Sequence, residues 1–446
     1  MFAHLFQPAC GRPSLAALAL ITLAAVAAVG GPAARAQEFT FPSRSDEVPV
    51  LTAIEISGNE HSDRSLVLRI MALEIGRPLT LDDMDRAWDS LEDCGFFRFV
   101  EMEYDDEEPG EVVLRVILEE DLSTYYGPLL RYDRRFKYLA GGQVELRNLR
   151  GKGEKLRIEA APAYIQHALV SWDRPWFLGR KGLQARVEVS GRQGGFVHRP
   201  FRFRKWDAAA EVRWSSSGGL FLDARFGVGQ FERRDGFAWP SPVRGDEPAG
   251  ATDLFLPGID DLTVVELAGG WDSRDNAYYP QGGIFCEGRA RRWTSDATPT
   301  YLETSLDARA FLPLPWSGHL LALHAWGRTT DRPAHLDNLL FLGGPGSVRG
   351  LPLGVREGDS GYLLSAEYRI PLFLLPISPQ GELVGFGIHF FGDAGDAWFH
   401  GDEAGRAIQS LGAGAHLNLD TLQLRFEGAR TSEGDWRFEF MDTFNF

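Results

Sequence analysis

The sequence predicts a small α+β domain followed by an all-β, antiparallel transmembrane barrel of about 16 strands. Three observations favour this fold class. Acidic residues concentrate in a short N-terminal region, segments of alternating polarity recur through the last 325 residues, and the chain ends on an aromatic residue. With 44% hydrophobic residues, the 446-residue chain is also too apolar to belong to the disordered class.

The charge is unevenly distributed along the chain, whose net charge is −16. Residues 46–121 hold 22 acidic and 6 basic residues, whereas residues 122–446 hold 39 acidic and 37 basic residues. This change predicts a domain boundary near residue 121. The acidic balance also excludes a general nucleic-acid-binding protein, because phosphate binding needs a basic surface.

Residues 1–36 have the pattern of a secretory signal peptide. An apolar run over 15–29 follows Arg12, and residues 34–36 supply the small side chains that cleavage requires. A membrane anchor is the alternative, but this run is shorter than the ~20 residues that span a bilayer as a helix. Residues 37–49 are expected to be a linker.

The rest of the chain has no apolar stretch long enough for a transmembrane helix. It is therefore expected to be either a soluble secreted protein or a membrane β-barrel, in which only every second residue faces lipid. Three cysteines are too few for a disulfide scaffold. Cys10 would leave with the signal peptide, and we expect Cys94 and Cys286 to be unpaired thiols.

Residues 50–121 predict one small domain with the element order β-α-α-β-β. Polarity alternates over 50–57, which predicts a strand, and the apolar residues that follow have helical spacing. Thr80, with acidic residues after it, predicts the N-cap of a second helix that ends near Gly95. Two alternating strands flank a turn at 108–110. The apolar residues of the two helices are Leu66, Ile70, Leu73, Met84, Ala87, Trp88 and Leu91.

This region resembles a POTRA domain, a periplasmic module that precedes outer-membrane barrels. The resemblance rests on the run Ile-Glu-Ile-Ser before Gly58-Asn59, on Gly95-Phe96-Phe97 between helix and strand, and on the closing Glu119-Glu120. An unrelated domain of two helices and three strands is the alternative. The resemblance implies a periplasmic location and a sheet edge that receives unfolded polypeptides.

Residues 122–446 contain many segments in which apolar and polar residues alternate. One face could contact lipid, while the other carries charges of both signs, as a wet lumen would. Aromatic residues lie near the segment ends, as in the girdles of membrane barrels. A soluble β-sandwich also alternates, but this length at ~10 residues per strand favours a barrel of about 16 strands. Clear segments are 143–147, 155–160, 184–189, 220–226, 302–310 and 422–427.

The last segment resembles the C-terminal signal of outer-membrane barrel proteins, although Asp442 interrupts its apolar parity. An ordinary edge strand is the alternative. A seam is expected between this segment, 437–446, and the first barrel strand near 125–134. The aromatic residues of one parity are Trp436, Phe438, Phe440, Phe444 and Phe446.

Residues 329–360 form a Pro- and Gly-rich stretch between strands, and long loops of this kind usually carry function. Within it, the run from Gly343 to Leu351 resembles the Val-Arg-Gly-aromatic motif of the BamA/TamA superfamily, with Leu351 in place of the aromatic residue. The segments 271–283, 365–372 and 391–398 resemble further family strands in the expected order. The motif residues are Asp272, Arg274, Asp275, Gly344, Val348, Gly395 and Trp398.

Strand parity places Glu367 and Asp393 on the lumen face, where an arginine from an inward loop would find two carboxylates. A bidentate pair of this kind, shielded from water, is geometrically specific. The resemblance implies that Arg349 and Gly350 lock the loop inside the barrel, with Asp393 as the main partner of Arg349 and Glu367 as a neighbour. A solvated loop charge is the alternative for Arg349.

The resemblance implies an outer-membrane assembly factor that inserts and folds β-barrel proteins, without catalytic residues, metal or cofactor. The expected partners are outer-membrane lipids, unfolded barrel polypeptides at the POTRA edge, and periplasmic chaperones or lipoproteins. One alternative is a two-partner transporter of polypeptides, which usually has two POTRA domains and a plug helix. Another is a passive channel or structural barrel.

The sequence gives little support to an enzyme. Residues 358–361 resemble the nucleophile segment of trypsin-like proteases, but the partner histidine segment is absent. Glycines 343–346 lack the Gly-Lys-Ser/Thr sequence of a phosphate loop. The ten histidines have no metal-ligand spacing, and we expect His389 and His416 to line the lumen.

Overall fold

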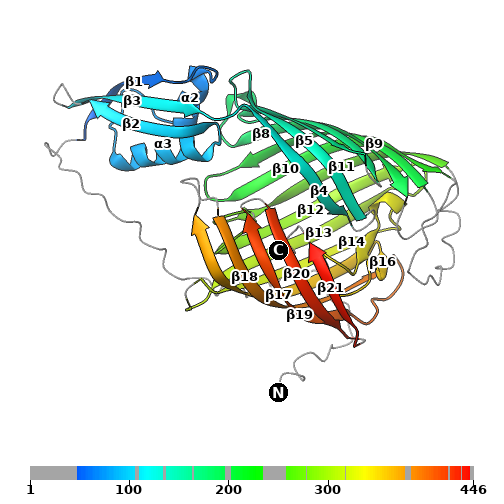
Figure 1. Ribbon diagram of the computed structural model, residues 1–446. Helices are drawn as coiled ribbons and strands as arrows, with labels where there is room; N and C mark the ends of the chain where they lie inside the picture. Colours follow the sequence, from blue (N-terminus) through cyan, green and yellow to red (C-terminus); the bar gives the residue numbers. More distant parts are fainter. Residues whose placement is uncertain are drawn as a thin grey trace.

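The structure is a computed structural model (Figure 1). It describes residues 48–105, 110–133, 137–162, 165–195, 202–234, 258–277, 279–316, 318–376, 383–419, 422–432 and 434–441. The predicted signal peptide and all but the last two residues of the predicted linker lie outside these ranges. Among the described residues, no helix is long and apolar enough to cross a membrane.

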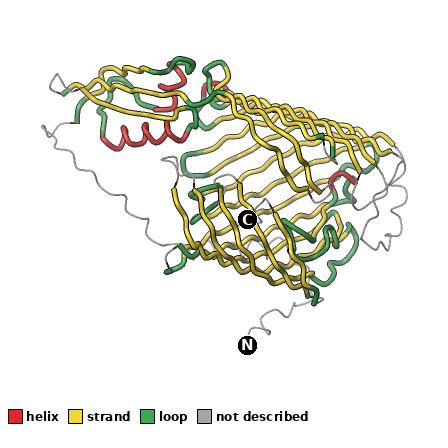
Figure 2. The backbone as a smooth tube through the Cα atoms, viewed as in Figure 1, coloured by secondary structure: helices red, strands yellow, loops and turns green. Residues whose placement is uncertain are grey.

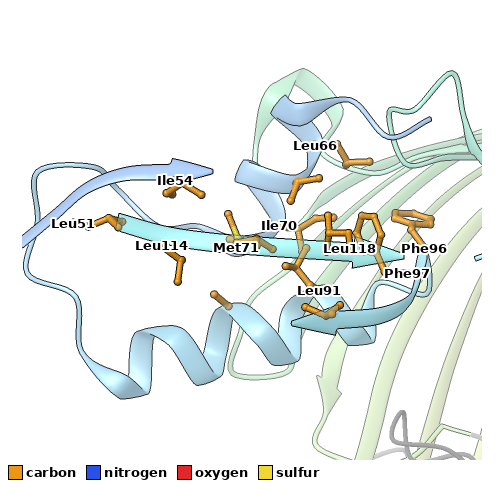
Figure 3. Packing of buried hydrophobic residues seen from close by; sticks show 14 of the residues in the cluster. Leu51, Ile54, Leu66, Ile70, Met71, Leu91, Phe96, Phe97, Leu114 and Leu118 are labelled. Carbon is orange, nitrogen blue, oxygen red and sulfur yellow. The ribbon is translucent and has the colours of Figure 1, made fainter. Parts of the chain in front are cut away.

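A small N-terminal α/β domain contains the first five elements in the predicted order. They are β1 (Val50–Ser57), α2 (Arg64–Met71), α3 (Leu81–Asp93), β2 (Phe97–Asp105) and β3 (Glu111–Glu120). The central strand β3 pairs with β1 in parallel and with β2 in antiparallel orientation, so β1 and β2 are the edges. Both helices pack on one face of this sheet, where Leu66, Leu91 and Leu114 are buried (Figure 3).

Local sequence signals determine the ends of both helices. Thr80 caps α3 as predicted, because its hydroxyl accepts a hydrogen bond from the backbone of Asp83 and the Asp83 carboxylate accepts one in return. The first helix is shorter than expected, since Ala72 adopts a left-handed conformation and Leu73 lies beyond the helix end. Cys94 forms no disulfide among the described residues, as expected; its thiol donates to the Leu91 carbonyl and its side chain packs against the domain core.

The remaining strands form the predicted antiparallel sheet of 16 strands, which curls into a barrel (Figure 1). Helix is largely confined to the N-terminal domain (Figure 2). The strands are β4 (Thr124–Asp133), β5 (Lys137–Leu149), β6 (Glu154–Ala161), β7 (Gln166–Arg174), β8 (Leu183–Gly195), β9 (Arg202–Ser215), β10 (Leu220–Arg234), β11 (Gly258–Asp272), β12 (Gly283–Ser295), β13 (Tyr301–Pro313), β14 (Leu320–Thr330), β17 (Ser360–Pro376), β18 (Leu383–Trp398), β19 (Ile408–Leu419), β20 (Leu422–Thr431) and β21 (Trp436–Met441).

The sheet has two edges, β4 and β21. Within the described residues, backbone pairing runs from β4 through every intermediate strand to β21, and no pairing joins β4 to β21 directly. We call the gap between these two strands the seam. The end of the barrel next to the N-terminal domain is the proximal end, and the opposite end is the distal end.

The lumen is packed with side chains, which differs from the wet lumen that the charged segments predicted. Near its distal end, an apolar cluster includes Leu129, Leu139, Phe203 and Phe231, and the two phenylalanine rings stack at 5.8 Å. Phe203 lies on the same parity of β9 as the lumenal charge Lys205. The alternation of polar and apolar residues therefore located the lumen face of the strands correctly, but it did not reveal that apolar side chains fill part of the lumen.

The N-terminal domain is attached to the barrel through two proximal turns. In the β5–β6 turn, the Asn148 side-chain amide donates to the Ser62 hydroxyl over 2.7 Å, and the backbone N–H of Asp63 donates to the Gly151 carbonyl over 2.9 Å. In the β7–β8 turn, Trp176 packs against the core of the N-terminal domain. The contacts join a folded domain to folded turns, so they fix its position relative to the barrel.

These two turns also concentrate unusual backbone conformations. Five non-glycine residues in the described ranges have positive φ, and four of them are Asn148, Arg150, Trp176 and Leu178. Such conformations cost free energy and persist only where the surrounding contacts enforce them. The N-terminal domain therefore meets the barrel through a specific, ordered interface rather than through a flexible linker.

Glu120 supports this junction from within the N-terminal domain and carries a pH-dependent prediction. Its carboxylate accepts hydrogen bonds from the backbone N–H groups of Ser62 (2.6 Å) and His61 (2.9 Å). Burial acts to raise the pKa of Glu120, but these hydrogen bonds outweigh it and hold the pKa below its ordinary value. A lowered folded-state pKa stabilises the junction above the ordinary pKa of glutamate, and this contribution is lost as pH falls through the lowered value.

Replacing Glu120 by glutamine should weaken the junction by about 1 kcal/mol, because a neutral acceptor binds these two donors less strongly. Amide hydrogen exchange of His61 and Ser62 in the full-length protein should then accelerate roughly fivefold at neutral pH. After correction for intrinsic exchange rates, lowering the pH should deprotect these amides in the wild type but not in the variant. Equal protection in both proteins at neutral pH would contradict this role of Glu120.

Candidate functional site

The segment between β14 and β17 folds back from the distal end into the lumen. Although its sequence is rich in Pro and Gly, this segment has regular structure. It contains a short 3-10 helix, η3 (Leu336–Asn338), and a small hairpin of β15 (Leu340–Leu342) and β16 (Arg356–Gly358). We call residues 331–359 the inner loop.

Small residues allow the inner loop to lie directly against the barrel wall. Gly350 has a φ of +78°, and a Cβ atom there would lie 2.4 Å from the Cβ of Ala429 on β20. Gly395 on β18 lies beneath Val348, where a Cβ atom would approach the Tyr362 carbonyl oxygen to 2.7 Å. A side chain at Gly350 would push the loop away from β20, and one at Gly395 would clash with the neighbouring strand β17.

Arg349 is fully buried and bonds to three carboxylates on three strands. Its Nε and Nη2 atoms donate to the two oxygens of Asp393 on β18, over 2.7 and 2.8 Å. Its Nη1 donates to Glu367 on β17 over 2.7 Å and to Glu427 on β20 over 3.2 Å. The guanidinium also lies 3.6 Å from the centre of the Phe391 ring. The structure thus brings Arg349, Asp393 and Glu367 together, with a forked pair between Arg349 and Asp393.

Two further arginines balance these carboxylates. Arg425 on β20 donates to Glu367 over 2.5 Å and to Glu427 over 2.9 Å, and Arg369 on β17 donates to Glu367 over 2.8 Å. We call these three arginines, with Asp393, Glu367 and Glu427, the Arg349 cluster. Buried charges are costly unless they are paired, so the loss of one member leaves an uncompensated charge.

The sequence pattern does not identify Arg425 and Glu427 as members of this cluster. Both lie on the polar parity of the 422–427 segment, so their lumenal orientation was predictable. Their proximity to Arg349 depends on the strand register: Glu427 pairs with Gly414 on β19, which pairs with His389 on β18. Nothing in the local sequence specifies this register.

Histidines extend the cluster toward the proximal end, and they line the lumen as expected. His389 Nε2 lies 2.9 Å from Glu427, and its Nδ1 lies 3.1 Å from the Nδ1 of His416. His416 in turn contacts the hydroxyl of Tyr279 over 2.8 Å. Tyr279 belongs to the proximal β11–β12 turn, so these contacts connect that turn to the Arg349 cluster.

Glu367, His389 and Glu427 lie close enough together to supply metal ligands, with ligand atoms within 4.8 Å of one another. The residues do not suit a cation, however, because both carboxylates already accept hydrogen bonds from Arg349 and Arg425. A divalent ion would be placed against two guanidinium groups. The arrangement suits an internal ionic cluster better than a metal site.

The other predicted motif residues shape turns and packing around the loop. Arg274 forms a bidentate pair with Asp272 over 2.9 and 2.8 Å, and Asp275 accepts the backbone N–H of Gln281 over 2.9 Å, which closes the β11–β12 turn.

In the inner loop, Gly344 accepts a hydrogen bond from Ser347, and Val348 is fully buried in a second apolar cluster. Leu351 occupies the same cluster. Trp398 ends β18, and its carbonyl accepts the N–H of Asp359.

The predicted C-terminal aromatic residues lie partly within the described ranges. Trp436, Phe438 and Phe440 on β21 expose 62%, 85% and 45% of their surfaces, so they point away from the lumen. Phe444 and Phe446 lie outside the described residues.

Comparisons with known proteins agree with this architecture. Residues 148–431 match the family model of the Omp85 superfamily domain. A solved structure of BamA from Haemophilus ducreyi lacking POTRA domains 1–3 is similar, with a TM-score of 0.67 and 15% identity over 88% of this chain and 84% of that chain. CdiB from Acinetobacter baumannii and CdiB from Escherichia coli each give a TM-score of 0.57 at 14% identity over 88% of this chain, and 73% and 76% of theirs. No curated protein sequence matches the chain.

Proposed function

This chain belongs to the Omp85 superfamily, and we propose that it is an outer-membrane assembly factor that inserts and folds β-barrel proteins. The observation that supports this function best is the seam. In the described residues, β4 and β21 each present an unpaired edge, although both belong to a 16-stranded sheet. A free edge offers backbone hydrogen bonds to another strand without regard to its sequence, which suits a protein that handles many substrates.

The packed lumen argues against the alternative of a passive channel. A channel needs a continuous wet path, but the inner loop, the Arg349 cluster and the distal apolar cluster lie across the lumen. In this proposal Arg349 and Gly350 lock the loop in the lumen, and the seam provides the route for substrate. Neither catalytic residues nor a cofactor has a part in this mechanism.

We also propose the compartments and the domain division. A signal peptide over 1–36 directs the chain to the outer membrane, and 37–49 is a linker. Residues 50–121 form a POTRA-like domain in the periplasm, and residues 122–446 form the barrel. On this assignment, the proximal end faces the periplasm and the inner loop enters from the cell exterior.

The POTRA-like domain offers a sheet edge that suits capture of extended polypeptides. Strand β2 is an edge, and Phe99 and Tyr104 expose about half of their surfaces there, at 50% and 48%. Exposed Glu101 and Glu103 lie between these aromatic residues. Such an edge would favour extended segments with apolar and basic residues, including those of a barrel substrate or of a periplasmic chaperone or lipoprotein.

A transporter that secretes one partner polypeptide remains the second candidate, because the fold is also similar to that of CdiB. The two functions differ in cargo. An assembly factor acts on many membrane barrels, whereas a transporter of this kind releases one soluble polypeptide.

Depletion of the protein in its native cells distinguishes these candidates. We expect the levels of several other outer-membrane barrel proteins to fall severalfold, while their transcripts stay constant, because unfolded barrels are degraded in the periplasm. Quantitative proteomics of isolated outer membranes measures this. Unchanged barrel levels together with loss of a single secreted polypeptide would favour the transporter instead.

A further inference from the structure

The inner loop has a second set of barrel contacts, separate from the Arg349 cluster. Asp337 in η3 pairs with Lys205 on β9 over 2.7 Å, and His335 Nε2 lies 3.2 Å from the carboxylate of Asp260 on β11. The Asn338 side-chain amide donates to Glu303 on β13 over 2.6 Å. We call His335–Asn338 with these partners the distal anchor.

The distal anchor consists of specific contacts between buried residues. His335 and Asp337 retain only 2% and 5% of their accessible surface. The His335 side chain accepts the backbone N–H of Asp337 and so caps η3, and Arg328 on β14 donates to the Asn338 carbonyl over 2.6 Å. The side chains of His335, Asp337 and Asn338 thus each have a partner on the barrel wall.

Apolar contacts extend the distal anchor to the first barrel strands. Leu336 and Leu339 pack in the cluster that contains Leu129 of β4 and Leu139 of β5. The other end of the loop reaches the last strands: Arg349 bonds to Glu427 on β20, and Gly350 packs on Ala429 of the same strand. The inner loop therefore reaches β20 directly and shares an apolar cluster with β4 and β5 on the other side of the seam.

From these contacts we propose that the inner loop is a strut that crosses the lumen and sets the width of the seam. Since no described backbone pairing joins β4 to β21, the loop links the two sides of the seam through the distal apolar cluster on one side and through β20 on the other. The distal anchor holds the β4–β14 wall, and the Arg349 cluster holds the β17–β21 wall. Release of the distal anchor frees the first wall while Arg349 remains bound.

We assign a positioning role at the seam to Lys205, Asp337, His335 and Asp260, whichever cargo passes through the seam. The two ends of the strut differ in construction. Arg349 makes several hydrogen bonds within one fully buried ionic cluster, whereas η3 makes single contacts to several different strands. The distal anchor is accordingly the end that yields first when the seam widens.

The test uses charge reversal across the Lys205–Asp337 pair in the full-length protein. Lys205→Asp places an acid beside Asp207 and Asp337, and Asp337→Lys places two lysines together. The double swap restores an opposite-charge contact. Spin labels at Leu130, in the distal half of β4, and at Phe440 on β21 report the seam by pulsed EPR after Cys94 and Cys286 are replaced by serine.

We expect a single narrow distance distribution in the wild type, a broadened or longer distribution in each single variant, and a return to the narrow distribution in the double swap. Glu188→Lys serves as the matched control, because Glu188 pairs with Arg225 on the wall without a contact to the loop among the described contacts. A single variant that loses its folded gel mobility is replaced by Asp337→Asn, which removes the charge but keeps the shape. Unchanged distances in the single variants, or a double swap as broad as they are, would overturn the strut.

Discussion

Replacing Arg349 by alanine will destabilise the barrel by about 3–5 kcal/mol, the range measured when one partner of a buried ion pair is removed. The substitution leaves Asp393, Glu367 and Glu427 buried with two arginines instead of three. It also releases the forked bond to Asp393 that holds the inner loop to β18. Arg349→Lys should recover part of the loss, because it restores the charge but not the fork.

Heat-modified mobility on gels measures this effect, since a folded barrel migrates differently from an unfolded one. The transition of Arg349→Ala should occur at a distinctly lower temperature than that of the wild type. Arg309→Ala is the matched control: Arg309 also makes a bidentate pair with Asp307, but 27% of its side chain is exposed, so its loss should cost only about 1 kcal/mol. Equal transitions for Arg349→Ala and wild type would show that the cluster does not lock the loop.

Much of this architecture follows from the sequence because period-two alternation specifies which face of a strand is wet or apolar. The six clear segments all lie in strands, the 16-stranded antiparallel sheet is confirmed, and the N-terminal β-α-α-β-β order is confirmed. Parity also placed Glu367 and Asp393 on the lumen face, where both contact Arg349. The resemblance supplied the choice of Arg349 among many loop charges.

The remainder depends on long-range geometry that local patterns do not encode. Strand register around the barrel decides that Glu427 and Arg425 reach Arg349, and the path of the loop decides that Asp337 meets Lys205. One signal was present: Phe203 shares the parity of Lys205, as Phe231 shares that of Arg233. Large aromatic residues on an otherwise charged face indicate a dry, occupied region of the lumen.

Joining the two edges of the seam should abolish assembly activity. If substrate strands pair with the free edges of β4 and β21, a covalent link between those strands removes their access to the edges and to the membrane. We expect the rate of substrate insertion to fall at least tenfold, to the level of liposomes without the protein. This loss should exceed that of any single lumen variant, because it blocks the route directly.

The decisive measurement is therefore insertion of a chaperone-bound outer-membrane barrel protein into liposomes that contain the seam-linked protein. Cysteines at Leu130 and Phe440, in a background without Cys94 and Cys286, are joined by a linker that a reductant cleaves, and each single-cysteine variant is the control. The account predicts no insertion above background while the link is intact and wild-type rates after reduction. Insertion at the wild-type rate through a linked seam would contradict it.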